Sequence, residues 1–114
     1  IKPGKSMGAY VGTTDPNFTV VMQQPQTFNY FYWQHRKQNN GYLQVLSVDI
    51  YGSNDNETFT KINDEVINII EDLYDTQYFD IPESTYRYVK VQYRSYSSGG
   101  SSAQVAEFGL GLKL

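Results

Sequence analysis

The chain has 114 residues, a formal net charge of −3 at pH 7 and no cysteine. This length suits a single domain with one core and is too short for two. Nucleic acids and anionic membranes attract basic surfaces, so the acidic balance argues against a nucleic-acid partner and makes a membrane partner a poor fit. The lack of cysteine excludes a disulfide framework, a thiolate metal site and a cysteine nucleophile.

Tyrosine is frequent, with 11 copies in a chain whose aromatic share is 16% and whose charged share is 18%. A tyrosine ring combines apolar contact area with a hydroxyl group, which suits neutral partners that carry hydroxyls themselves. Tyrosine is also a common strand former, so the composition alone leaves both explanations open.

The start of the chain predicts an irregular segment and then a strand. Residues 1–17 hold several glycines and prolines without a clear period, apart from a short strand expected near Ala9–Val11. Phe18–Met22 is apolar and β-branched and predicts a strand, whereas Gln23–Gln26, which contains Pro25, predicts a turn.

Two longer strands are expected next. Phe28–Arg36 alternates between two ring-bearing faces, which indicates a sandwiched or central strand with Trp33 in the core. The turn signal Asn39-Asn40-Gly41 follows. Leu43–Tyr51 predicts another strand, whose alternation slips near Val45-Leu46 as a β-bulge would make it do.

The middle of the chain is less clear. Gly52–Asn56 predicts a turn and Thr58–Ile62 a strand. Asn63–Tyr74 fits either a helix capped by Asn63 or a strand with a loop insertion. We favour the strand because Glu71 and Asp72 would lie where the helix dipole disfavours acidic groups.

The last third predicts strands separated by one loop. Tyr78–Ile81 is expected to pair briefly before Pro82, and Tyr86–Tyr93 alternates as a half-buried strand does. Ser95–Ser102 predicts a flexible loop and Ala103–Leu112 a closing strand. The whole pattern predicts one all-β domain over residues 1–114, an antiparallel sandwich or barrel.

Three patches of the sequence carry a family likeness. They are Arg36–Gly41 leading into Val48–Asp55, then Phe59–Ile62, and finally Tyr86–Val91 with the Ser/Gly loop and Ala106–Phe108. In this order the chain resembles the discoidin family of coagulation-factor type C (F5/8 type C) domains, and within it the bacterial galactose-type carbohydrate-binding modules. The likeness covers roughly residues 20–112. It implies an eight-stranded antiparallel jelly-roll β-sandwich with ligand loops at one end.

Two departures from the family pattern concern the metal and the front of the domain. Residues 1–17 hold no counterpart of the family's N-terminal strands, calcium loop or ligand histidine, so N-terminal strands could be missing. Asn56 stands where the family has a glycine. Glu107 matches a glutamate that contributes to calcium in some members, but calcium takes six to eight oxygens. We therefore expect no cofactor, with structural calcium through Glu107 as a weak candidate.

Arg36 is the first candidate for contact with a sugar. A planar guanidinium can donate two parallel hydrogen bonds to neighbouring hydroxyls, and the family's ligand arginine occupies this loop. The alternative is an arginine that braces the turn by pairing with Asp49 or Asp55. Asn40, with Asn39 beside it, could both donate to and accept from hydroxyls, or could simply supply turn geometry.

Tyr96 and His35 complete the candidate site. Tyr96 stands where the family places an aromatic platform, with Tyr42 and Tyr93 as alternates, although it could equally be folded back on the core. His35 could bond a hydroxyl, but a lone histidine at a strand end is more often structural.

No nucleophile and base stand out as a pair, so we do not expect an enzyme. The sequence predicts a non-catalytic carbohydrate-binding domain that attaches a larger extracellular or cell-surface protein, bacterial in type, to glycans, with a galactose-like neutral sugar implied by the resemblance. Its partners would be glycans and the neighbouring domains of the larger protein. The alternative is a structural or protein-interaction module of a surface assembly without sugar binding.

Overall fold

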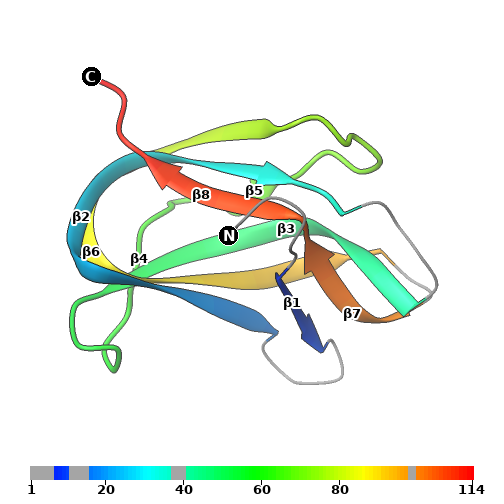
Figure 1. The fold of residues 1–114 in the computed structure, drawn as a ribbon, viewed down its shortest axis with the longest axis horizontal. Coiled ribbons are helices and arrows are strands. Elements are labelled where there is room, and N and C mark those ends of the chain that lie inside the picture. The colour runs from blue at the N-terminus through cyan, green and yellow to red at the C-terminus, as the bar shows by residue number, and fades with distance from the viewer. Residues whose placement is uncertain (1–6, 11–15, 37–40, 98–99) are drawn as a thin grey trace.

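A computed structural model of the chain describes residues 7–10, 16–36, 41–97 and 100–114, and all regular structure in these ranges is β-strand (Figure 1). Figure 1 labels the strands, which are β1 Met7–Tyr10, β2 Asn17–Gln34, β3 Gly41–Ser53, β4 Thr60–Lys61, β5 Ile67–Asn68, β6 Gln77–Tyr96, β7 Gly100–Val105 and β8 Glu107–Gly111. No helix that could cross a membrane occurs in the described ranges.

The strands form one hydrogen-bonded sheet in the order β1-β7-β3-β6-β2-β8, with β4 and β5 paired to β3 beside this path. Every pairing in the described ranges is antiparallel except that of β3 with β7. The predicted all-β antiparallel fold is therefore confirmed. Strand β1 at Met7–Tyr10 overlaps the short strand expected near Ala9–Val11, so the described part of the front contributes an N-terminal strand to the sheet.

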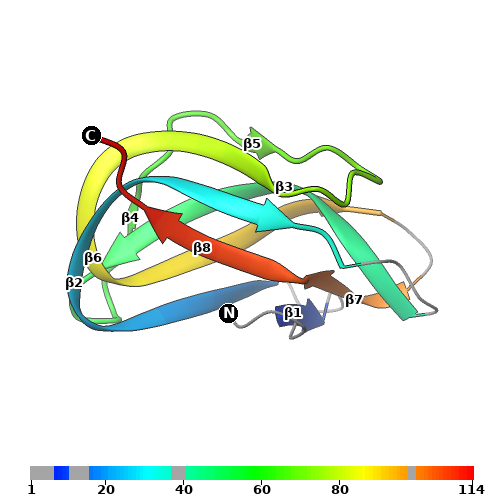
Figure 2. The ribbon, with the colours of Figure 1, turned by 45° about the horizontal axis from the view of Figure 1, so that its top comes forward.

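The sheet becomes a sandwich because β2 and β6 each run through both layers. The first half of β2 pairs with the second half of β6, with Phe18 opposite Val91, and the second half of β2 pairs with the first half of β6, with Phe31 opposite Phe79. Both strands curl round together at one end of the molecule (Figures 1 and 2). The result is the jelly-roll arrangement that the resemblance implied.

The bends explain two wrong boundaries in the sequence prediction. Gln23–Gln26 is not a turn between strands and Pro82 does not end one, since β2 and β6 continue through both. The pairing register shifts between Val21 and Gln26 and again between Phe28 and Tyr30, opposite Pro82. A proline is tolerated in a strand at such an irregularity because no ladder hydrogen bond is required of it there.

Aromatic side chains from both layers meet in the core. Phe18 of β2 lies edge-on to Phe108 of β8, with ring centroids 5.4 Å apart, and Trp33 lies edge-on to Tyr93 of β6 at 6.3 Å. Trp33 and Phe31 are completely buried, as the alternation predicted. Strand β2 is central, as expected, because it pairs with β6 and β8. It is not sandwiched, because Tyr30 and Tyr32 on its other face are half-buried.

The remaining elements partly follow the prediction. The expected bulge near Val45-Leu46 is confirmed by register shifts on either side of Ser47. Asn63–Tyr74 contains no helix and only the short strand β5. Asn63 is buried, where its side chain accepts from the Ile50 amide at 2.8 Å and donates to Asp49 Oδ1 at 2.8 Å.

The predicted closing strand Ala103–Leu112 is two strands. β7 pairs with β3, and β8 pairs with β2 in the other layer. The chain changes layer at Ala106, whose amide donates to the Gln34 carbonyl at 2.8 Å. The expected loop Ser95–Ser102 is also shorter than predicted, since β6 runs to Tyr96 and β7 begins at Gly100.

Replacing Trp33 by alanine tests the core. Removing a completely buried indole leaves a cavity between the layers, and we expect a loss of about 3–5 kcal/mol in the free energy of unfolding, measured by urea denaturation. Leu112→Ala is the control, because Leu112 is 43% exposed, and it should change stability by less than about 0.5 kcal/mol. A Trp33→Ala protein as stable as the control would contradict this account of the core.

Candidate functional site

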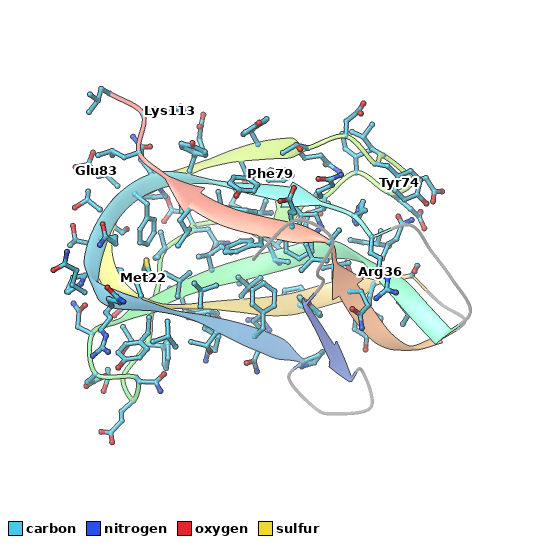
Figure 3. The ribbon with its side chains drawn as sticks, in the orientation of Figure 1. Met22, Arg36, Tyr74, Phe79, Glu83 and Lys113 are labelled. Atoms are coloured by element: carbon cyan, nitrogen blue, oxygen red, sulfur yellow. The ribbon has the colours of Figure 1, made fainter. Side chains whose placement is uncertain are left out.

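One end of the sandwich gathers the ends of several strands and is called the loop end here, defined by residues 35–36, 69–76 and 96–97. Figure 3 labels Arg36 and Tyr74 at this end, whereas Met22 and Glu83 lie at the opposite end, where β2 and β6 bend. Because β6 doubles back, both of its ends, Gln77 and Tyr96, lie toward the loop end, and the last residues of β2 lie there as well. Segments far apart in sequence therefore contribute to one surface.

His35 is buried at the loop end, with 2% of its surface exposed, and it joins β2 to the segment before β6. Its Nε2 lies 2.8 Å from the Ile70 carbonyl oxygen, and the Trp33 indole N–H donates to its Nδ1 at 3.3 Å. A carbonyl can only accept, so Nε2 carries the proton and the ring is neutral. Burial lowers the pKa of His35, and the Ile70 hydrogen bond and nearby Asp72 and Glu71 oppose this only in part.

Gln44 holds the residues 70–76 against β3. Its side chain is buried, with 1% exposed, and its Nε2 donates to Asp72 Oδ1 at 3.0 Å and to the Tyr74 hydroxyl at 2.9 Å. Its Oε1 accepts from the Asp72 amide at 2.8 Å. Asp72 has a φ of 60°, a left-handed conformation that is uncommon outside glycine. The three hydrogen bonds from one amide fix that conformation.

Gln44 also fixes the end of β6 through its backbone. The backbone N–H of Gln44 donates to Ser97 Oγ at 2.9 Å, and the backbone N–H of Ser97 donates to the Gln44 carbonyl at 2.9 Å. Next to it, Tyr96 pairs with Val45, is half-buried and packs against the hydrophobic core. Its ring thus belongs partly to the core and partly to the surface of the loop end.

Tyr93, the alternate platform, is a core residue. It is 3% exposed, and its hydroxyl has no hydrogen-bond partner among the described residues. Burial raises the pKa of the Tyr93 phenol far above its usual value. Its ring is therefore not accessible to a ligand.

Arg36 follows His35 directly and is half-buried. The carboxylates suggested as its alternative partners are engaged elsewhere. Asp49 pairs with Arg94 and, at 3.7 Å, with Lys61, and the Asp55 carboxylate accepts from the Glu57 and Thr58 amides, each at 2.9 Å. Asn39 and Asn40 lie outside the described residues, and so does the side chain of Tyr42.

Asp49 and Asp55 are both held ionised by their partners. Burial alone raises the pKa of Asp49, but the Asn63 and Arg94 hydrogen bonds and the charges of Arg94 and Lys61 outweigh it and hold the pKa below its usual value. Hydrogen bonds from the backbone of residues 58 and 57 and from the Ser53 hydroxyl lower the pKa of Asp55 to about 2. These carboxylates stabilise turns and strand faces at positions other than the loop end.

Glu107 is the weak calcium candidate that the family resemblance implied. This residue begins β8 opposite Gln34 and is half-buried. No group of three or more acidic, histidine or cysteine side chains suited to a metal occurs in the part of the chain that the structure describes. One carboxylate is far from the six to eight oxygens that calcium takes. The calcium candidate stays a prediction.

The comparison with protein families identifies the domain. A model of the F5/8 type C domain matches residues 5–108. The chain belongs to the F5/8 type C domain family. This confirms the resemblance that the three sequence patches carried.

Several solved structures share the fold of this F5/8 type C domain. The module CpGH89CBM32-5 from Clostridium perfringens, in complex with GalNAc-β-1,3-galactose, is 17% identical with a TM-score of 0.76. The match covers 95% of this chain and 78% of that module. CBM32-3 from a family 31 glycoside hydrolase of the same organism is 15% identical with a TM-score of 0.77, and the match covers 95% of this chain and 75% of that module. The CBM32 of AlyQ, in complex with 4,5-unsaturated mannuronic acid, is 13% identical with a TM-score of 0.71, and the match covers 92% of this chain and 75% of that structure. No curated protein sequence matches the chain.

The sequence pattern did not single out Gln44, Asp72 or Tyr74. Gln44 lies between Leu43 and Val45 and looks like an outward polar residue of an alternating strand, although it is almost completely buried. Its partners lie 28 and 30 residues away. The one signal in the sequence was the run of residues 71–75, which is rich in acidic side chains and could have suggested a buried polar partner on a neighbouring strand.

The pH dependence of stability tests the placement of His35. Its pKa is lowered in the folded state, so the unfolded chain binds the extra proton first, and stability should fall as the pH drops below about 6.5. His35→Gln cannot titrate and should show a smaller loss between pH 7 and pH 5 in urea denaturation. His35 is the one histidine of the chain, so its NMR titration gives the folded pKa directly, and a midpoint above 6.5 would contradict this placement.

Removing the Gln44 amide tests the hold on residues 70–76. Gln44→Met keeps the size of the side chain but loses three hydrogen bonds, and we expect a stability loss of about 2 kcal/mol and faster hydrogen exchange of the Asp72 amide. Gln34→Met is the control, because Gln34 makes one longer bond to the Tyr74 carbonyl, at 3.3 Å. Equal exchange of Asp72 in both variants would rule out Gln44 as the anchor.

Proposed function

We propose that this F5/8 type C domain is a carbohydrate-binding domain whose site lies at the loop end, with Arg36 as its principal ligand residue. One observation carries the proposal. Arg36 directly follows His35, whose ring is fixed on both nitrogens, so its backbone is anchored beside a buried, hydrogen-bonded residue. Rigid placement lowers the entropy cost of binding, which matters for a ligand that forms few hydrogen bonds.

The ligand that fits best is a neutral sugar, galactose-like by family resemblance. The Arg36 guanidinium donates to two neighbouring hydroxyls, and Asn40, with Asn39, adds groups that donate and accept. The half-buried Tyr96 ring provides a face for the apolar side of a pyranose. His35 positions Arg36 and does not contact the sugar, because its two ring nitrogens are used by Trp33 and Ile70. Modules of the same fold in complex with GalNAc-β-1,3-galactose and with 4,5-unsaturated mannuronic acid support a sugar ligand.

The biological role is attachment rather than catalysis. Within the described ranges, the buried carboxylate Asp49 is held by Arg94, Lys61 and Asn63, so it is not available as an acid or base. A site with few hydrogen bonds binds weakly against competing water, and avidity from repeated domains would make such attachment effective. The domain would hold a larger extracellular or cell-surface protein on glycans.

A glycan array with wild type and Arg36→Ala tests the site. Loss of a charge-assisted hydrogen-bond donor should weaken binding to galactose-terminated glycans roughly tenfold or more. Arg36→Lys should recover little, because an ammonium cannot form the paired contact. The control is Arg87→Ala, since Arg87 donates to the Met22 carbonyl at 2.8 Å, and Met22 lies at the opposite end of the sandwich (Figure 3). Equal binding by wild type and Arg36→Ala, with circular dichroism unchanged, would remove Arg36 from the site.

A further inference from the structure

The outer face of the layer made by β8, β2 and β6 carries a group of tyrosines. On β2, Tyr30 lies between Gly111 of β8 and Asp80 of β6, and the next residue on the same face, Tyr32, lies between Gly109 and Tyr78. The opposite face of these strands is the core, with Phe31, Trp33 and Phe108. Tyr30, Tyr32 and Tyr78 therefore share the face that points away from the core, and they are called the tyrosine face here.

The two glycines of β8 decide how the rings of β2 lie. A β-carbon at Gly109 would come within 2.4 Å of the outer ring atoms of Tyr32, and one at Gly111 within 2.3 Å of those of Tyr30. The tips of both rings thus occupy the space that a side chain on β8 would need. The rings lie down over the edge strand instead of standing off the sheet, which is the arrangement in which an aromatic ring covers a strand glycine.

Tyr78 completes the group. It is 69% exposed, and its ring centroid lies 6.3 Å from those of both Tyr30 and Tyr32, tilted by 53° to each. Lys113 Nζ lies 5.9 Å from the Tyr30 ring centroid and pairs with Asp80, which places charged groups at one border of the rings. Gln34 lies at the other border, next to the loop end. The surface is aromatic in the middle and polar around it.

We propose that the tyrosine face is a second carbohydrate-binding surface, one that takes an internal stretch of a polysaccharide chain lying across the sheet. The rings offer apolar surface to the CH groups of successive pyranoses, and the polar border offers partners to their hydroxyls. β8 ends the order of strands, so no further strand of the described ranges closes this side of the sheet. A long chain can therefore enter and leave the face. The proposal does not depend on the loop end.

The size of the surface favours a glycan over a protein partner. A stable protein interface buries about 800 Å² on each side. Even at about 200 Å² for each whole ring, three tyrosines of which two are half-buried offer far less. No exposed aliphatic side chain of the described strands extends the group, since the other residues on this face are glycine, Gln34, Asp80 and Glu107. Stacking on a sugar chain requires only ring faces.

The test uses affinity electrophoresis in gels that contain soluble galactan, arabinoxylan or polygalacturonate. Tyr78→Ala is made in the Arg36→Ala background, so that contacts through Arg36 are absent from both proteins compared. We expect Arg36→Ala to be retarded by at least one of these polysaccharides, and the double variant to bind roughly tenfold more weakly, whereas Tyr78→Phe, which keeps the ring, retains binding. Because Tyr78 is 69% exposed, its replacement should leave the fold intact, and circular dichroism checks this.

The matched control is Arg36→Ala with Tyr88→Ala. Tyr88 lies on β6, as Tyr78 does, but it is half-buried and pairs with Ser53 of β3 in the other layer. No retardation of the Arg36→Ala protein in any of the three gels, or equal retardation of the Tyr78→Ala and Tyr88→Ala double variants, overturns the proposal. The glycan array with wild type and Arg36→Ala tests the loop end separately. A negative result for the tyrosine face can therefore be distinguished from a negative result for the loop end.

Discussion

The structure depends on the sharing of two strands between its layers. Because β2 and β6 pair with each other twice, once in each layer, the bend that they make together closes the sandwich and sets the alignment of the two inner faces. That alignment brings Phe18 against Phe108 and Trp33 against Tyr93. It also fixes where the loops lie, since strands that double back must start and finish at the same end. The core and the loop end thus follow from one constraint.

Buried polar groups then give the loop end its shape. A buried amide or imidazole is costly unless its hydrogen bonds are satisfied, so Gln44 and His35 tolerate few arrangements of the segments around them. Gln44 fixes Asp72 and Tyr74, and His35 fixes Ile70. The segment from Ile70 to Tyr74 has no regular structure of its own, yet it is held by Gln44 of β3 and by His35, which follows the end of β2. An ordered surface at the strand ends is what a weakly binding sugar site needs.

The sequence predicted those features that depend on neighbouring residues. Alternation gave the buried face of Phe31 and Trp33, and the slip near Val45 gave the bulge. The same local patterns gave wrong boundaries at Pro25 and Pro82, because a proline ordinarily interrupts a strand and only the paired register shows that each one falls in a bend. The hydrogen bonds of Gln44 reach residues 28 and 30 positions away, which no local pattern reports. The asparagines expected beside Arg36 lie outside the described residues, so that part of the site stays a prediction.

The tyrosine content illustrates why composition could not distinguish a packing role from a binding role. Tyr93 is a core residue, and Tyr86 covers Gly52, where a β-carbon would come within 2.2 Å of its ring. Tyr32 covers Gly109 in the same way, so this tyrosine serves the packing of its strand. Tyr78 lies over none of these glycines, Gly52, Gly109 and Gly111, and it is mostly exposed. The register between strands that are far apart in the sequence decides which tyrosine lies over a glycine, so an exposed tyrosine such as Tyr78 can be identified only when that register is known. The tyrosine content of the chain therefore reflects strand packing at some positions, such as Tyr32, and exposed rings at others, such as Tyr78.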